Sequence, residues 1–133
     1  MVSQNPRALR ILLVEDDAAS RQALNGLAQT LGHQTHVAQN MWQALDLVIS
    51  GNQAFDLLLS DISLPDGNGW ELLRCLTDGG RRPWRAIAMS GRSSMEDLAR
   101  SQTAGFEQHL LKPVAPAIVE AILREAAQEL PRG

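Results

Sequence analysis

The sequence of 133 residues predicts an α/β protein with a doubly wound, five-stranded parallel sheet. Two observations lead to this fold class. Five short apolar runs of strand length alternate with five segments of helical periodicity, which is the order of βα units around a parallel sheet. The runs Ile11–Val14 and Leu57–Leu59 are apolar at consecutive positions, which is typical of strands buried on both faces.

The five expected strands are the apolar runs along the chain, of which the last is the least apolar. They are Ile11–Val14, Thr35–Ala38, Phe55–Ser60, Arg85–Met89 and Gln108–Leu111.

The first two helices are predicted from apolar spacing and from the residues at their ends. Leucine and alanine recur at helical spacing from Leu24 to Leu31, and Gly32 follows where a helix-terminating glycine belongs. Asn40 is the expected N-cap of a second helix that runs through Ser50 and is closed by Gly51.

The remaining three helices follow turn or capping residues. One runs from Trp70 to about Thr77, after a turn rich in glycine and asparagine. The next begins near Ser93 or Ser94 and stops at Gly105. The last spans Pro116–Leu130, with apolar residues at helical spacing.

Composition limits the class of protein. The length fits one domain over residues 1–133 with a core of about 9–130, and we expect no output domain after Leu130. Cys75 is the only cysteine, which indicates a reducing, cytoplasmic location. No apolar run is long enough to span a membrane. The net charge of -3 argues against a nucleic-acid partner.

Ionisable and hydroxyl residues follow four of the five strands. Glu15 and Asp16 follow the first strand, Asp61 the third, Ser90 the fourth and Lys112 the fifth. Ligands of a doubly wound sheet bind beyond the carboxyl ends of its strands, so these residues are expected to meet at one edge. Lys112 is the only lysine of this arginine-rich chain.

These residue types suit phosphoryl chemistry. Crowded carboxylates repel one another unless a cation neutralises them, and a set of oxygen ligands suits Mg²⁺. A carboxylate such as Asp61 can attack phosphorus to form an aspartyl-phosphate. Lys112 and the Ser90 hydroxyl would then stabilise the phosphoryl oxygens.

Four motifs in this order resemble the receiver domains of two-component signalling, such as the chemotaxis regulator. They are Ile11–Asp17, Ser60–Gly67, Met89–Gly91 and Leu111–Pro113. The resemblance implies a flavodoxin-like (βα)5 fold with strand order 2-1-3-4-5. It also implies a phosphoacceptor switch that takes its phosphoryl group from a histidine kinase or a histidine phosphotransfer domain. Met89–Leu110 resembles in particular the receivers of hybrid sensor kinases.

The resemblance assigns a role to each matching residue. Asp61 matches the phosphoacceptor, Asp16 the direct Mg²⁺ ligand, and Glu15 an acidic neighbour that acts through water. The backbone carbonyl of Ser63 would complete the metal ligands from the protein.

Ser90 matches the switch hydroxyl, and Lys112 the lysine that pairs with the phosphate. The family's Lys–Pro bond, here Lys112–Pro113, is cis. The resemblance also allows a dimer that forms on phosphorylation. We expect only self-phosphorylation and self-dephosphorylation, without turnover of a conventional substrate.

His109 departs from the family, which has tyrosine or phenylalanine at this position. Two interpretations stay open. A protonated imidazole could favour the active position when Asp61 is phosphorylated, or His109 could only fill the aromatic slot. We also predict that Arg92 pairs with the phosphoryl group, and that charge reversal at Arg21 slows transfer from the kinase alone.

Three other functions compete with this interpretation. A phosphatase with the same intermediate carries a general acid two residues after its nucleophile, where this chain has Ser63. A receiver-like binding module that is independent of phosphorylation usually lacks an acid or the lysine, and this chain keeps them. A flavin carrier requires a phosphate-binding loop after its first strand, which the sequence lacks.

Some prominent residues have structural interpretations. Asp17 is expected to cap the first helix. We expect the three tryptophans, Trp42, Trp70 and Trp84, to be packing residues rather than a binding stripe, and we expect no metal site at His33 or His36.

Overall fold

The structure is a computed structural model of the chain and describes residues 8–91 and 94–131. Strands and helices alternate along the chain, with one short hairpin between the third long strand and the third helix. The elements are β1 Arg10–Val14, α1 Ala18–Thr30, β2 Gln34–Ala38, α2 Met41–Val48, β3 Leu57–Asp61, β4 Ser63–Leu64, β5 Gly67–Asn68, α3 Gly69–Asp78, β6 Arg85–Ser90, α4 Met95–Ala104, β7 Gln108–Leu111 and α5 Pro116–Glu129.

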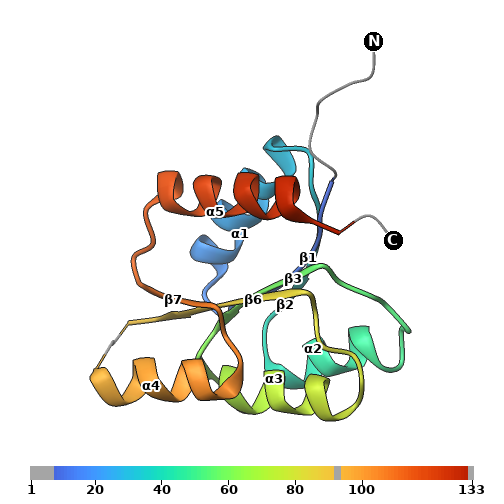
Figure 1. Cartoon of the computed structure of the whole chain (residues 1–133), viewed down its shortest axis with the longest axis vertical. Helices are drawn as coiled ribbons and strands as arrows, with labels where there is room; N and C mark the ends of the chain where they lie inside the picture. The colour runs from blue at the N-terminus through green and yellow to red at the C-terminus, as the bar shows by residue number, and fades with distance from the viewer. Residues whose placement is uncertain (1–7, 92–93, 132–133) are drawn as a thin grey trace.

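Five long strands form one parallel sheet in the order β2-β1-β3-β6-β7. Counted along the chain, this order is 2-1-3-4-5, which confirms the predicted topology. Strand order reverses at β1 and β3, which lie side by side at the centre of the sheet (Figure 1). The carboxyl ends of these two strands therefore form the switch point where ligands of such sheets bind.

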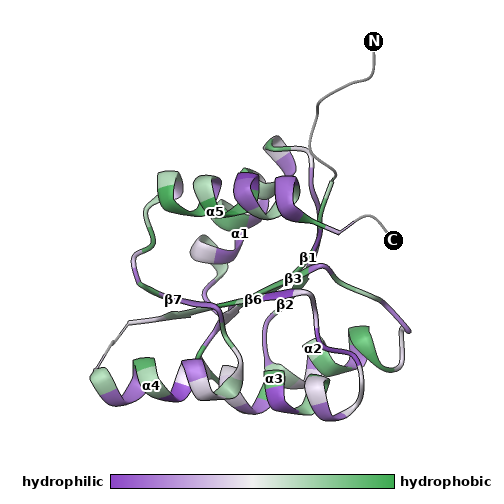
Figure 2. Ribbon diagram, in the orientation of Figure 1, coloured by the Kyte–Doolittle hydropathy of each residue, from purple (hydrophilic) through white to green (hydrophobic). Residues whose placement is uncertain are grey.

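The helices cover the two faces of the sheet in two layers (Figure 1). α1 and α5 lie on one face, and α2, α3 and α4 lie on the other. Alternate residues of β1 point into different cores: Leu12 and Val14 pack toward α2 and α3, whereas Ile11 and Leu13 pack toward α1 and α5. Figure 2 shows both hydrophobic and hydrophilic residues on the helices that cover the two faces of the sheet. The unbroken apolar runs thus fill both cores at once.

Helix ends follow the predicted glycines at two of three positions. Gly32 after α1 and Gly105 after α4 have φ of 92° and 110°, a left-handed conformation that costs glycine little. The prediction for Gly51 was wrong, because α2 ends at Val48 and the left-handed residue is Asn52, with φ of 50°. Gly51 is instead needed for space, since a Cβ there would lie 2.6 Å from the carbonyl oxygen of Leu47.

The tryptophans divide between core and surface. Trp70 packs against the core under α2 and α3, and Trp84 against the core under α1 and α5. The expectation that Trp42 is a packing residue was wrong, because Trp42 is 72% exposed on α2. His33 is buried and accepts a hydrogen bond from the backbone N–H of Leu9 through Nδ1 at 3.0 Å, a structural role. Within the described residues, no helix is long and apolar enough to cross a membrane.

Candidate functional site

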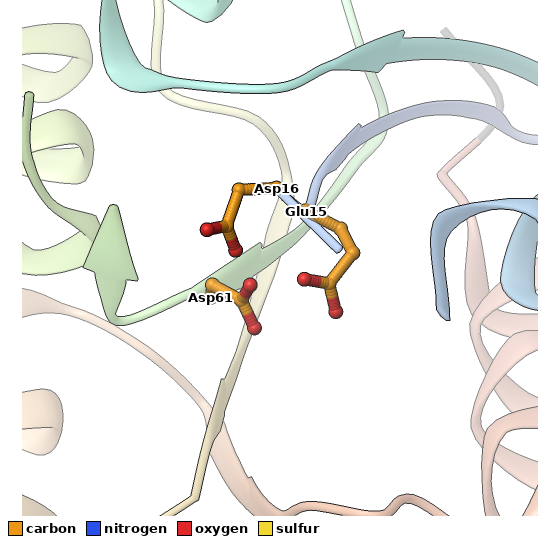
Figure 3. Close-up of side chains that lie close together, drawn as sticks. All are labelled: Glu15, Asp16 and Asp61. Carbon is orange, nitrogen blue, oxygen red and sulfur yellow. The ribbon is translucent and has the colours of Figure 1, made fainter. Parts of the chain in front are cut away.

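Three carboxylates converge where β1 and β3 end. Glu15 and Asp16 follow β1, Asp61 is the last residue of β3, and one oxygen from each lies within 4.8 Å of the others. Figure 3 shows the three side chains pointing toward one another. The sequence predicted this meeting of the ends of two neighbouring parallel strands.

The backbone places each acid differently. Glu15 extends the sheet, because its N–H donates to the Ala38 carbonyl at 3.0 Å, and its side chain is fully buried. Asp16 is exposed at the mouth of the site. Asp17 turns away and caps α1, accepting the Ser20 N–H at 2.9 Å, which confirms its predicted capping role.

Lys112 binds two of the carboxylates. Its Nζ lies 2.7 Å from Glu15 Oε1 and 2.8 Å from Asp61 Oδ1. The Lys112 N–H donates to the Ser90 carbonyl at 2.8 Å, so β6 and β7 hold its backbone. The Lys112–Pro113 bond is cis, as the resemblance implied. We call Glu15, Asp16, Asp61 and Lys112 the charged cluster.

The charged cluster holds more negative than positive charge in a buried place. Burial and the hydrogen bond with Glu15 raise the pKa of Asp61 to about 8, although Lys112 opposes the shift. Burial also disfavours ionised Glu15, but hydrogen bonds from Asp61 and Lys112 outweigh this cost and lower the pKa of Glu15. At neutral pH, Asp61 therefore carries a proton that it shares with ionised Glu15.

These oxygens could hold a divalent cation. The ligand set contains only oxygen donors, which suits a hard ion. Both Glu15 oxygens are already engaged, one by Lys112 and the other by the Asp17 N–H at 3.1 Å. The carboxylate oxygens of Asp16 and Asp61 are therefore more available than those of Glu15 for direct coordination of a cation.

A short hairpin, β4–β5, follows Asp61 and was not predicted. Ser63 begins it and is exposed, with its backbone two residues beyond Asp61. Gly69 closes it, and a Cβ at Gly69 would lie 2.5 Å from the Asp61 carbonyl oxygen. Asp66 accepts the N–H groups of Met41 and Trp42 at 2.8 and 2.9 Å, so it ties the hairpin to the start of α2. The glycine-rich turn in the sequence thus packs closely against the acceptor strand.

Arg21 supports the acidic loop and is partly buried. Its Nη1 donates to the carbonyl oxygens of Glu15 at 3.0 Å and Asp16 at 3.3 Å. From the sequence, Arg21 was expected to affect only transfer from the kinase. Arg21 follows these acids by six and five residues, and no motif in the sequence indicated the contact.

Ser90 and His109 meet at the edge of β6 and β7. Ser90 Oγ lies 2.8 Å from His109 Nε2, so the ring already points inward in this structure. His109 Nδ1 lies 2.7 Å from Ser101 Oγ, a contact that no motif in the sequence indicated. Arg92, the predicted partner of the phosphoryl group, lies outside the described residues.

Comparison with known proteins defines the class. The family model described as "Response regulator receiver domain" matches residues 11–124. The Regulator of RpoS from Escherichia coli K12 is 34% identical over 105 residues, which cover 79% of this chain and 30% of that protein.

Solved structures agree with this match. A response regulator receiver domain protein from Methanospirillum hungatei JF-1 superposes with a TM-score of 0.78 at 30% identity, over 92% of this chain and 99% of that one. A receiver domain of a histidine kinase from Syntrophus aciditrophicus shares the fold, with a TM-score of 0.83 over 95% of each chain at 24% identity. This chain therefore belongs to the response regulator receiver domain family. It has the phosphoacceptor role of that family in two-component signalling.

Proposed function

We propose that Asp61 is the phosphoacceptor and that Mg²⁺ binds beside it, held by Asp16, Asp61 and the backbone carbonyl of Ser63. One observation carries the proposal: a single lysine, Lys112, lies within 2.8 Å of both Glu15 and Asp61 among three converging carboxylates. Its ammonium group stands where the oxygens of a phosphoryl group on Asp61 would arrive.

The transfer step forms one bond and breaks another. An Asp61 carboxylate oxygen attacks the phosphorus of a phosphohistidine, and the P–N bond breaks with its electron pair returning to the imidazole. The phosphodonor is a histidine kinase or a histidine phosphotransfer domain, the partners with which receiver domains work. Lys112 and Ser90 stabilise the phosphoryl oxygens, and Glu15 keeps Lys112 in place.

The proton on Asp61 explains why a cation matters. Asp61 attacks only when it is ionised, and its raised pKa of about 8 keeps it protonated at neutral pH. Asp16, Asp61 and the Ser63 carbonyl would hold the Mg²⁺, and its charge would favour the ionised form of the carboxylates. Asp61 would then release its proton and become a nucleophile at neutral pH.

The test is covalent labelling from a small phosphodonor. We expect wild-type protein, incubated with acetyl phosphate and Mg²⁺, to gain the mass of one phosphoryl group. Asp61→Asn should not be labelled, whereas Asp46→Asn, an exposed control on α2, should behave as wild type. Chelator should suppress labelling. Labelling of Asp61→Asn to the wild-type extent would overturn the assignment, and no labelling of wild type would favour the phosphorylation-independent binding module.

A dimer that forms on phosphorylation is the second part of the proposal. Four exposed apolar side chains support it, on α4, β7 and α5: Met95, Leu98, Leu111 and Ile118. Burying such side chains between two copies would gain free energy. Light scattering after size exclusion, with and without beryllofluoride, should show a shift to the dimer mass that Leu111→Glu prevents. An unchanged monomer mass would remove this part alone.

A further inference from the structure

A chain of hydrogen bonds leads away from Ser90 between β7, α4 and α3. Ser90 Oγ contacts His109 Nε2 at 2.8 Å, and His109 Nδ1 contacts Ser101 Oγ at 2.7 Å. Trp70 Nε1 then donates to Ser101 Oγ at 2.8 Å. Ser101 is 1% exposed, so water does not replace these partners. We call Ser90, His109, Ser101 and Trp70 the serine–histidine relay.

The direction of each hydrogen bond follows from the chemistry at Trp70. An indole N–H only donates, so Ser101 Oγ accepts from Trp70. Within the described part of the chain, the other hydrogen-bond partner of the Ser101 hydroxyl is His109 Nδ1, so Ser101 donates its proton there. A neutral imidazole that accepts at Nδ1 carries its proton on Nε2. His109 therefore donates to Ser90 Oγ, and Ser90 gives its own proton to another acceptor.

We propose that Ser101 and Trp70 are positioning residues, which hold the His109 proton on Nε2 so that Ser90 offers its hydroxyl proton to the phosphoryl group. Ser90 directly follows Met89, the register partner of Asp61, so its backbone lies beside the acceptor at the same edge of the sheet. The opposite tautomer would accept the Ser90 proton and withdraw it from the phosphoryl group. This inference rests on the proposed function only for the last acceptor, the phosphoryl group.

The relay ends at the wall of a groove between α3 and α4. Trp70 lines this groove of about 610 Å³, and the Arg100 guanidinium lies over its ring at 4.2 Å. Linked hydrogen bonds polarise one another. A phosphoryl group that accepts from Ser90 should therefore alter the hydrogen bond of the Trp70 indole at the other end of the relay.

Nuclear magnetic resonance can read both ends of the relay. We expect the His109 ring nitrogens of the unphosphorylated wild type to report a proton on Nε2. With Mg²⁺ and beryllofluoride, the Trp70 indole N–H resonance should shift. In Ser101→Ala that response should disappear, and acetyl phosphate labelling should slow about three- to tenfold, the size expected for one hydrogen bond.

Matched variants separate the relay from packing. Ser101→Thr keeps the hydroxyl and should restore labelling. Thr77→Val removes a hydroxyl that donates to the Leu73 carbonyl within α3, and should label at the wild-type rate. Trp84→Phe removes an indole that also lies under an arginine, Arg85 at 4.5 Å, but packs on the other face of the sheet. The Trp70 response should survive in that variant.

Two results would overturn the inference. One is a proton on His109 Nδ1 in the wild type. The other is Ser101→Ala that labels at the wild-type rate and keeps the Trp70 response. Failure of acetyl phosphate to label wild type would count against the proposed function instead, since the His109 tautomer is measured without phosphorylation.

Discussion

The charged cluster and the serine–histidine relay begin at the same edge of the sheet, yet different forces hold them. In the charged cluster, Lys112 bridges buried Glu15 and Asp61, and the acids outnumber the lysine. In the relay, hydroxyl, imidazole and indole groups are hydrogen-bonded to one another from Ser90 to Trp70. The charged cluster has more acidic groups than its lysine can neutralise. The side chains of the relay, in contrast, are already hydrogen-bonded to one another.

This difference gives the two regions different roles, one in sensing charge and one in transmitting the response. An incomplete charge balance makes the free energy of the charged cluster depend on protons and cations. The hydrogen bonds of the relay depend on geometry, and salt affects them little. The charged cluster can therefore respond to a phosphoryl group, while the relay passes the response on without adding charge.

Removing Lys112 should have the greatest effect. Lys112→Ala should lower the unfolding free energy in chelator by about 3 kcal/mol, because it leaves the buried Glu15 charge without its partner. Urea denaturation at neutral pH measures it. The double variant Lys112→Ala/Glu15→Gln should lose much less, since it leaves no buried charge at position 15 without its partner. An equal loss in both proteins would mean that Lys112 acts through packing rather than charge.

The next effect is the pH dependence that Asp61 creates. Its folded pKa of about 8 lies above the ordinary value of 3.8, so the folded state keeps a proton that the unfolded chain releases. Stability in chelator should therefore fall as pH rises from about 5 to 8. Asp61→Asn should lack this slope and exceed wild type by about 1–2 kcal/mol at pH 8.

Thermal melts across this pH range test the slope. Glu15, whose pKa is lowered, contributes stability above its ordinary value of 4.5 that is lost as pH falls below it. Its effect therefore lies outside the window of 5 to 8. Parallel curves for wild type and Asp61→Asn would contradict the shared-proton account of the charged cluster.

A third variant, Asp16→Asn, separates the effect of Mg²⁺ binding from the effect of the Asp61 proton. Asp16 is exposed, so Asp16→Asn should change stability little in chelator. Wild type should gain about 1.4 kcal/mol at Mg²⁺ ten times above its Kd, and the variant should gain much less. Calorimetric melts with Mg²⁺ and with Ca²⁺ measure the gain. Equal gains would place the cation away from Asp16.

The relay should show a smaller loss that does not depend on ions. Ser101→Ala should lower the unfolding free energy by about 1 kcal/mol, the value of one net hydrogen bond. The loss should be the same in chelator, in Mg²⁺ and in high salt, unlike the effects in the charged cluster. Urea denaturation under the three conditions measures this loss. A loss that varied with Mg²⁺ would mean that the relay and the charged cluster are energetically coupled.

The weakest effect concerns Arg21. Arg21→Ala should cost about 0.5 kcal/mol, since a partly buried side chain loses its hydrogen bonds to two carbonyl groups of the acidic loop. Because Arg21 supports this loop, we expect Arg21→Ala to slow acetyl phosphate labelling as well as transfer from the kinase. Gln22→Ala, an exposed neighbour, is the control. Arg21→Ala that labels at the wild-type rate would restore the original prediction of a docking role alone.

The order of the elements and the edge where the site lies could be predicted from the sequence alone. Apolar runs such as Ile11–Val14 report burial on both faces, and parallel strands bring their carboxyl ends together. Glu15, Asp61 and Lys112 were therefore predictable as neighbours although 97 residues separate the first from the last. Gly32 and Gly105 ended their helices as predicted, because a left-handed residue is a local requirement.

The pairing of side chains, in contrast, became visible only in three dimensions. Ser101 is one serine in a polar helix, and neither its burial nor its contacts with His109 and Trp70 leave a periodic pattern. The glycine at position 51 is required by the nearby Leu47 carbonyl, and Trp42 faces solvent although tryptophan is usually buried. Periodicity records which face of an element is covered, whereas hydrogen-bond partners depend on how separate elements approach one another in space.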